Sequence, residues 1–194
     1  IWKIEQLAPA SMGDQTAASI FSKGYALWTK RQLEDGEIAD ALALVQRATE
    51  LATNEADTRA ARALIMATAA VLHESKRHQD AVGIYREVIG KWPDWHEAYD
   101  ALGLIYCETG EYAEALAAYG RSLNLNPDSA RSHHNMALAH DALGHREQAI
   151  VHWERTLELD PNYPEVHSNL AKAYARENQV GAVKPQPNAR SEAR

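Results

Sequence analysis

A spacing of 34 residues constrains this chain more than any other feature of its sequence. Three kinds of residue recur with this spacing and in one common register. The positions that share it are Ala81, Ala115 and Ala149, then Tyr85, Tyr119 and Trp153, and then Pro93, Pro127 and Pro161. A fixed period of this length indicates a repeat protein, in which each unit buries its apolar face against its neighbours.

Residues 96–129 carry the most complete copy of the repeat. Its signature positions, in order, are Tyr99, Leu102, Gly103, Tyr106, Ala115, Tyr119 and Pro127. They fall at the spacings W-x2-L-G-x2-Y, A-x3-F and P of the tetratricopeptide signature, with Tyr in place of the first Trp. The chain therefore resembles the tetratricopeptide repeat (TPR) family. The resemblance implies an all-α solenoid of helical hairpins, wound as a right-handed superhelix, with about four repeats and a C-terminal capping helix.

The period also predicts where the segments of the chain begin and end. We expect an N-terminal arm over 1–13 and a solenoid over 14–178. The predicted segments of the solenoid are repeats at 22–55, 62–95, 96–129 and 130–163, and a capping helix at 164–178. A Pro-containing tail follows over 179–194. The second repeat is preceded by extra residues in a run rich in Ala, Leu and Met, so we expect its first helix to be overlong.

Charge and hydropathy exclude two classes of partner. The formal net charge is −7, whereas binding to a nucleic-acid backbone requires a basic face, so we expect no nucleic-acid partner. No apolar run reaches the roughly 20 residues that a membrane helix needs.

The single cysteine, Cys107, carries no signature of a redox compartment, and the chain starts at Ile1 rather than Met. Cytoplasm and periplasm both stay open, as does a signal or anchor before Ile1.

TPR arrays line a concave groove with the first helix of each repeat, and the resemblance implies such a groove here. Helical geometry places positions 2, 5, 9 and 12 of each repeat on one stripe. The candidate contacts with a protein or peptide partner on this stripe are Asp100, Leu104, Arg131, His134, Leu138 and Lys172. The alternative interpretation is a solvated face without a partner.

Two asparagines, Asn135 and Asn169, recur at position six of successive first helices. They resemble the asparagine ladder of long TPR superhelices, in which side-chain amides hold an extended peptide backbone. In the alternative interpretation they cap or bridge neighbouring helices. The Lys/Asn/Arg clamp of TPR co-chaperones is incomplete, because the matching positions hold Met66 and Ala70, Ala101, and Arg131 and Asn135.

Trp92 and Trp95 flank a proline turn between the second and third repeats. They are candidates for an aromatic binding edge. The alternative is that both rings are buried between the repeats, where a large side chain can fill the groove while its N–H reaches water.

The sequence shows few features of a metal site or of an enzyme. His133 and His140 are seven residues apart, as are His145 and His152, too far for either pair to bind one ion without help from a facing helix. We therefore expect no metal and no cofactor. Cys107 with His73 or His134 lacks an orienting third group, and no phosphate-binding or nucleophile-elbow motif occurs, so we expect no enzyme.

These observations favour a non-enzymatic interaction scaffold, either a subunit or an assembly partner of a larger protein complex. Such a complex would hold the chain through its groove, its aromatic edges, the arm at Trp2 and the C-terminal tail. The alternative is a transient assembly or transport factor of the cell envelope that handles a peptide or precursor protein. The sequence does not name the partner, because repeats of this kind present a surface rather than a reaction.

Overall fold

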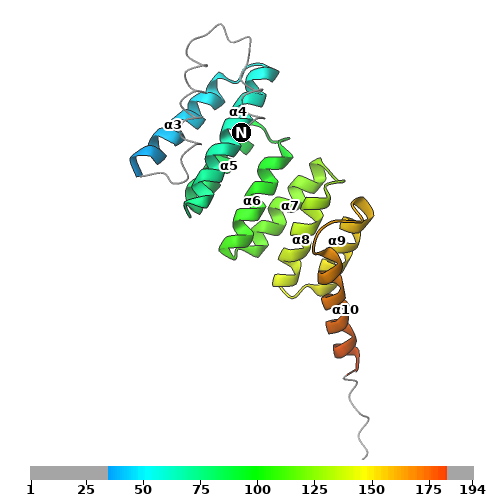
Figure 1. Ribbon diagram of the computed structural model, residues 1–194. Coiled ribbons are helices and arrows are strands. Elements are labelled where there is room, and N and C mark those ends of the chain that lie inside the picture. The colour runs from blue at the N-terminus through cyan, green and yellow to red at the C-terminus, as the bar shows by residue number, and fades with distance from the viewer. Residues whose placement is uncertain (1–34, 183–194) are drawn as a thin grey trace, which may run out of the picture. The chain divides into compact units, whose positions relative to one another are not determined.

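The computed structural model describes the backbone of residues 35–182 and the side chains of residues 38–176. All regular structure in this part of the chain is helical (Figure 1). The helices are α3 (Asp35–Leu51), α4 (Glu55–Glu74), α5 (His78–Lys91), α6 (His96–Thr109), α7 (Tyr112–Leu125), α8 (Ala130–Ala142), α9 (Arg146–Leu159) and α10 (Val166–Ala182). The predicted arm over 1–13, the first helix of the repeat predicted at 22–55 and residues 183–194 of the tail predicted at 179–194 lie outside the described residues, whereas residues 179–182 of that tail belong to α10.

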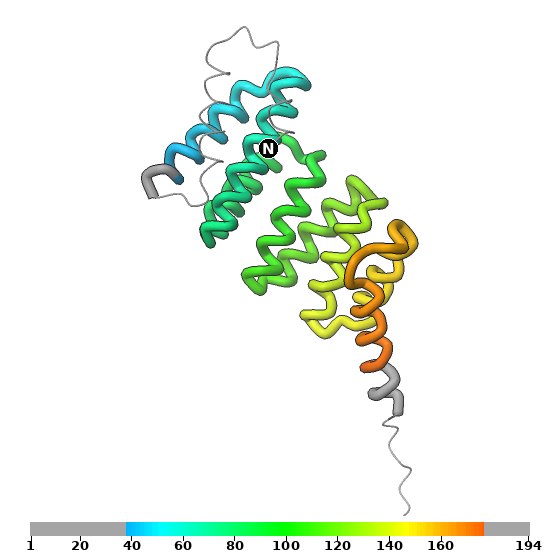
Figure 2. The backbone as a smooth tube through the Cα atoms, viewed as in Figure 1, coloured from blue at the N-terminus to red at the C-terminus, as the bar shows by residue number. Residues whose placement is uncertain are grey.

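The chain divides between Pro127 and Asp128 into two compact units. In the first unit, α3 to α7 pack in chain order, each on the next, and α3 also touches α5. Figure 2 shows these five helices as a series of antiparallel rods joined by short turns. None of the described helices in either unit is long and apolar enough to cross a membrane.

Helix α4 is 20 residues long, whereas α6 has 14. This confirms the overlong helix expected from its Ala-, Leu- and Met-rich sequence. The helix begins where the Asn54 side chain accepts a hydrogen bond from the Asp57 backbone N–H at 2.9 Å, which satisfies one of the free donors of the first turn. Its inner face is buried through Ala61, Ile65 and Leu72, all fully inaccessible to solvent.

Glycine ends α6 in the first unit. Gly110 has φ +82°, and its N–H bonds to the Cys107 carbonyl at 3.2 Å, so the chain turns sharply into α7. Gly144, with φ +77°, takes the same left-handed conformation between α8 and α9 in the second unit. Both are turn positions of the repeat, where a residue without a Cβ atom avoids the steric cost of positive φ.

The second unit contains α8, α9 and α10 around one hydrophobic core. The buried members of this core are Ala137, Ala149, Ile150, Trp153, Val166, Leu170 and Ala173. Two surface contacts also fix α10: Tyr174 donates to Glu154 on α9 at 2.6 Å, and Arg176 lies 3.7 Å from Asp141 on α8. Helix α10 therefore covers the apolar faces of the preceding hairpin.

Candidate functional site

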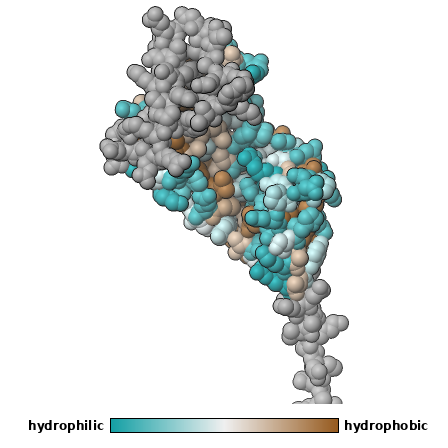
Figure 3. All heavy atoms as spheres, viewed as in Figure 1, coloured by the Kyte–Doolittle hydropathy of each residue, from teal (hydrophilic) through white to brown (hydrophobic). Residues whose placement is uncertain are grey.

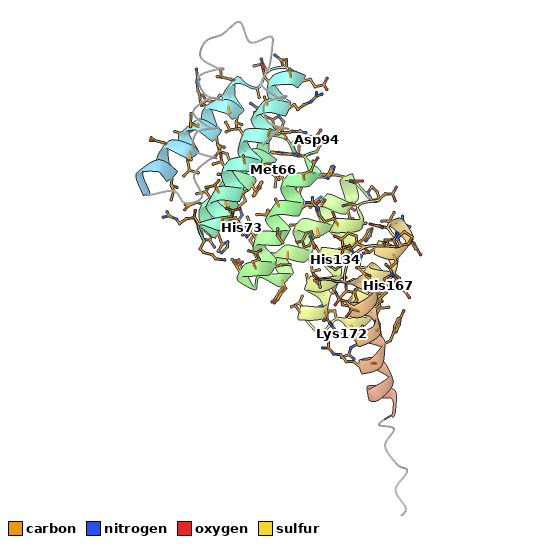
Figure 4. All side chains as sticks on the ribbon, in the orientation of Figure 1. Met66, His73, Asp94, His134, His167 and Lys172 are labelled. Atoms are coloured by element: carbon orange, nitrogen blue, oxygen red, sulfur yellow. The ribbon has the colours of Figure 1, made fainter. Side chains whose placement is uncertain are left out.

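A cavity of about 430 Å³ lies between the N-terminal part of α4 and the start of α6 in the first unit. Its wall is formed by Glu55, Thr58, Arg59, Arg62, Ala63, Met66, Trp95 and Glu97. The wall combines an apolar floor with charged side chains of both signs. Figure 4 labels Met66 on this face of α4 and Asp94 at the turn before α6.

Arg62 joins this cavity to the tryptophan pair. Its guanidinium carbon lies 5.1 Å from the centre of the Trp95 ring and 5.5 Å from that of Trp92, within the range of a cation–π contact. The two indole rings meet edge to face at 5.9 Å, and Arg62 also lies 3.4 Å from the Asp94 carboxylate. Trp95 is only 3% exposed and Trp92 is half-buried. Trp95 is therefore buried between helices, as in the second interpretation of the tryptophan pair. Its ring also lines the cavity.

The stripe predicted on α6 is only partly open. Leu104 is 44% exposed, as expected for a contact residue, but Asp100 is 4% exposed and does not present its carboxylate to solvent. Helical periodicity places both residues on one side of the helix. Because α6 packs on both α5 and α7, less of its surface stays open than periodicity alone predicts.

The stripe of the second unit is more open. Arg131, Leu138 and Lys172 are exposed, and Figure 4 labels Lys172 on α10. His134 differs from its prediction as a contact residue, because it is 7% exposed and its ring packs on Tyr163 with a centroid distance of 4.9 Å. Burial lowers the pKa of His134, and the nearby Glu165 carboxylate opposes that effect. His134 is therefore mainly a packing residue. The face of the molecule in Figure 3 is largely polar where it is coloured, with apolar residues scattered over it.

Asn135 on α8 and Asn169 on α10 are both half-buried. Within the described part of the chain, neither side-chain amide takes part in a hydrogen bond, although the Asn169 backbone N–H donates to the Glu165 carbonyl. Among the described residues, no side-chain hydrogen bond supports the interpretation in which these amides cap or bridge helices. Each amide keeps a donor and an acceptor available at the edge of the helix.

Four histidines gather on the hairpin of α8 and α9. The Nδ1 atoms of His133 and His152 lie 2.9 Å apart, so one ring donates to the bare nitrogen of the other. The His140 ring stacks on His152 at 5.6 Å and also meets His145 at 5.7 Å. Burial, with repulsion from His133 and His140, lowers the pKa of His152 to about 4. Sequence spacing along one helix could not reveal this cluster, because its closest pair joins two facing helices.

Cys107 lacks the environment of a catalytic thiol. It is half-buried, and burial raises its pKa, an effect that a hydrogen bond with Tyr119 opposes and the Glu108 charge reinforces. A nucleophilic cysteine needs a lowered pKa so that the thiolate forms at neutral pH. His73, one of the two bases considered for it, instead contacts the Glu108 carboxylate.

Comparison with known proteins identifies the class to which this architecture belongs. A family model described as TPR repeat matches residues 103–144 and 142–178, and one described as tetratricopeptide repeat matches residues 29–94. The chain belongs to the tetratricopeptide repeat family. The comparison of the sequence with curated proteins found no match.

Solved structures agree on the fold. The crystal structure of MamA protein superposes with a TM-score of 0.67 over 87% of this chain and 86% of its own, at 18% identity. The first TPR of Spaghetti (RPAP3), bound to the HSP90 peptide SRMEEVD, has a TM-score of 0.58 over 59% of this chain and 91% of its own, at 20% identity. The second TPR domain of human RPAP3, in complex with the HSP70 peptide SGPTIEEVD, has a TM-score of 0.54 over 57% and 92%, at 16% identity. These likenesses establish a TPR solenoid fold.

Proposed function

We propose that this protein is a non-enzymatic scaffold that binds a protein or peptide partner along the open faces of its first helices. In a larger assembly it would act as a subunit or assembly partner. Family membership supports this function, since TPR units stack into extended binding surfaces. Two structural neighbours are solved with bound peptides, which supports a peptide or an extended segment as the partner.

The open amides of Asn135 and Asn169 carry this proposal. An extended peptide that leaves water must satisfy its backbone N–H and C=O groups, and a side-chain amide can donate and accept at once. Helices α8 and α10 are in contact through Asp141 and Arg176. Packed helices lie about 8 to 10 Å apart, a step that an extended chain covers in about three residues. Each amide can therefore hold one peptide unit of the same strand.

The side chains around the amides indicate what else the peptide meets. Leu138 is 42% exposed and offers an apolar contact, while Arg131 and Lys172 add positive charge at the exposed edge of α8 and of α10. This combination favours a peptide with an apolar side chain and acidic neighbours. In the first unit, the cavity beside Arg59, Met66 and Trp95 offers a second, more apolar contact surface.

A free C-terminal carboxylate is not part of the proposed recognition. Met66, Ala70 and Ala101 occupy positions where the co-chaperone clamp has polar or basic residues, so these positions provide no donor for a terminal carboxylate. A peptide with an amidated C-terminus should therefore bind as tightly as the free acid. Preference for the free acid would contradict an internal, backbone-directed mode of binding.

The test begins with short peptides selected from a random display library against the whole chain. For the selected peptides, the double variant Asn135→Ala/Asn169→Ala should lose about 1 to 3 kcal/mol of binding free energy, measured by calorimetry, with little change in melting temperature. The matched control is Asn124→Ala/Asn162→Ala, which removes two exposed asparagines outside the stripe. Equal losses in both double variants, or none in the first, would contradict the proposed site.

A further inference from the structure

Three potential metal ligands from three helices meet at one end of the first unit. His73 lies in the last turn of α4, His78 is the first residue of α5, and Glu108 lies near the end of α6. One ligand atom from each residue falls within 4.8 Å of the other two. Among the described residues, this is the one group of three or more such side chains that comes this close together. We propose that these three residues form a binding site for a divalent transition-metal ion, best matched by Zn²⁺.

The geometry of the two histidines is set by a tight turn. Lys76 has φ +62°, a left-handed conformation that residues other than glycine seldom adopt. The turn is closed by backbone hydrogen bonds from Lys76 to the His73 carbonyl at 2.9 Å and from Arg77 to the Leu72 carbonyl at 2.8 Å. It reverses the chain so that the rings of His73 and His78 meet edge to face at 5.3 Å. The backbone thus holds two imidazoles side by side.

Glu108 supplies the third ligand from a separate hairpin. Its carboxylate contacts Nε2 of His73, and the side chains of His73 and Glu108 are 27% and 39% exposed. Figure 4 places His73 at the end of α4, beside the end of α6. The Nδ1 atom of His78 is buried and has no hydrogen-bond partner among the described residues. The group therefore contains a carboxylate, an imidazole that faces it and a second imidazole with an unsatisfied nitrogen.

The charges around the group are compatible with a cation. The turn carries two basic residues: Lys76 is exposed, and Arg77 is paired with Asp80 at 2.8 Å, which offsets its charge. Glu74, next to His73 in sequence, is exposed and adds a negative charge to the same turn. The Glu108 carboxylate supplies the negative charge that attracts a divalent ion, and the two imidazoles supply nitrogen ligands.

The types of ligand select the kind of metal. Two imidazole nitrogens and one carboxylate oxygen suit Zn²⁺ and other first-row ions, whereas Ca²⁺ and Mg²⁺ prefer oxygen ligands throughout. At Zn–N and Zn–O distances of about 2.1 Å, tetrahedral ligand atoms lie roughly 3.4 Å apart. The three ligand atoms already lie within 4.8 Å of one another, and the His73 and Glu108 side chains are partly exposed, so small rotations can bring the group to that separation. The fourth position would hold water or a ligand from a partner.

This site differs in kind from the proposed peptide-binding surface and does not depend on it. A bound ion would tie the turn between α4 and α5 to the end of α6, two elements that belong to successive hairpins. In a repeat protein, stability depends on contacts between neighbouring hairpins, so such a tie would stabilise the first unit. An ion that binds the folded chain alone stabilises it by RT ln(1 + L/Kd), where L is the concentration of free ion, so the melting temperature rises with that concentration.

The test is a titration of the metal-free whole chain with Zn²⁺, read by competition with a chromophoric chelator, and with Co²⁺, read by visible absorption. We expect one equivalent to bind, with the d–d bands of a four-coordinate site. His73→Gln, His78→Gln and Glu108→Gln should each weaken Zn²⁺ binding by about 100-fold or more, since loss of a ligand costs at least as much as loss of an outer-shell contact. Circular dichroism checks that each variant keeps its helices.

The control is His133→Gln/His152→Gln, which removes the closest pair of the other histidine cluster. This variant should bind Zn²⁺ as the unaltered chain does and should show the same rise in melting temperature with Zn²⁺, a rise that His78→Gln should lose. The proposal is overturned if the control loses binding while the His73 and His78 variants keep it. It is equally overturned if the unaltered chain binds no Zn²⁺ at micromolar concentrations.

Discussion

A Cβ atom added to Gly103 would lie 2.7 Å from Cε1 of Tyr119. The ring of Tyr119 is fully buried and packs on the backbone of α6 at the one position of that helix where no side chain stands in its way. The glycine and the aromatic residue of the repeat signature are therefore two halves of one contact between α6 and α7. The contact needs both, because a ring can approach a helix backbone this closely only at glycine.

Replacement of Gly103 by Ala should destabilise the protein by about 1 to 3 kcal/mol, the usual cost of overpacking a rigid core. The better helix propensity of alanine offsets part of this cost. The control is Gly83→Ala in α5, where an added Cβ meets nothing within 4 Å and should stabilise by up to about 1 kcal/mol. Urea denaturation of both variants measures the difference. Similar stability changes in the two would show that α7 can move away from α6 at little cost.

A second prediction concerns pH and the histidine cluster of α8 and α9. The pKa of His152 is lowered to about 4, so between that value and its unfolded value near 6.5 the unfolded chain binds more protons than the folded one. The stability contributed by neutral His152 is therefore complete above about pH 6.5 and is lost as the pH falls towards 4. Because the His152 side chain is partly exposed to solvent, which weakens its electrostatic interactions, we expect the free energy of unfolding to fall by no more than about 1 to 2 kcal/mol.

The measurement is the free energy of unfolding at pH 7 and pH 5 for the unaltered chain and for His152→Gln. The variant lacks the titrating group, so its stability should fall less over that interval. His167→Gln, an exposed histidine whose ring contacts the Pro161 carbonyl, serves as the control and should retain the full pH dependence. If stability fell equally with pH in all three proteins, His152 would be excluded as the source of the pH dependence.

A third prediction concerns the role of α10. Its buried residues Val166 and Leu170 complete a core with Ile150 and Trp153, so removal of the chain from Pro164 onward should expose those rings and methyl groups and cause fraying or aggregation. The point variant Leu170→Ala should cost about 2 to 5 kcal/mol. Lys172→Ala, exposed on the same helix, should change stability by less than about 0.5 kcal/mol. A truncated chain that stays monomeric with an unchanged melting temperature would contradict a capping role.

The all-helical repeat architecture could be predicted from sequence because its determinants are local and periodic. Gly110 and Gly144 mark turns, the signature positions mark packing faces, and the Ala-rich run marks the long α4. The surface was harder to predict. Position along a helix placed Asp100 and His134 on an open stripe, but neighbouring helices bury both.

The histidine contacts could not be predicted for a related reason. His73 and Glu108 are 35 residues apart and meet only because α4 and α6 end at the same place. Likewise, His133 faces His152 across a hairpin, and no spacing within either helix signals that contact. A single period specifies which helices neighbour one another. It does not specify which polar side chains at their ends come within bonding distance, since that depends on the turns and on helix length.

The last prediction separates the two roles considered for Trp92 and Trp95. Trp95 is almost fully buried under the Arg62 guanidinium, whereas Trp92 is half-buried and packs at the edge of a core formed by α3 and α4. Trp95→Ala should therefore cost about 3 to 5 kcal/mol of stability, the usual range for a buried aromatic residue. Trp92→Ala should cost clearly less, because part of its ring is already in water.

Arg62→Met tests the cation separately, because methionine keeps much of the apolar stem and removes the charge. It should cost about 0.5 to 2 kcal/mol, the range of a cation–π contact from exposed to desolvated sites, and should shift the tryptophan fluorescence. The control is Arg59→Met, which removes a more exposed arginine from the same cavity wall and should leave both readouts nearly unchanged. If Trp95→Ala instead kept full stability and lost only partner binding, the fold would not need the Trp95 ring. The two tryptophans would then act as a binding edge.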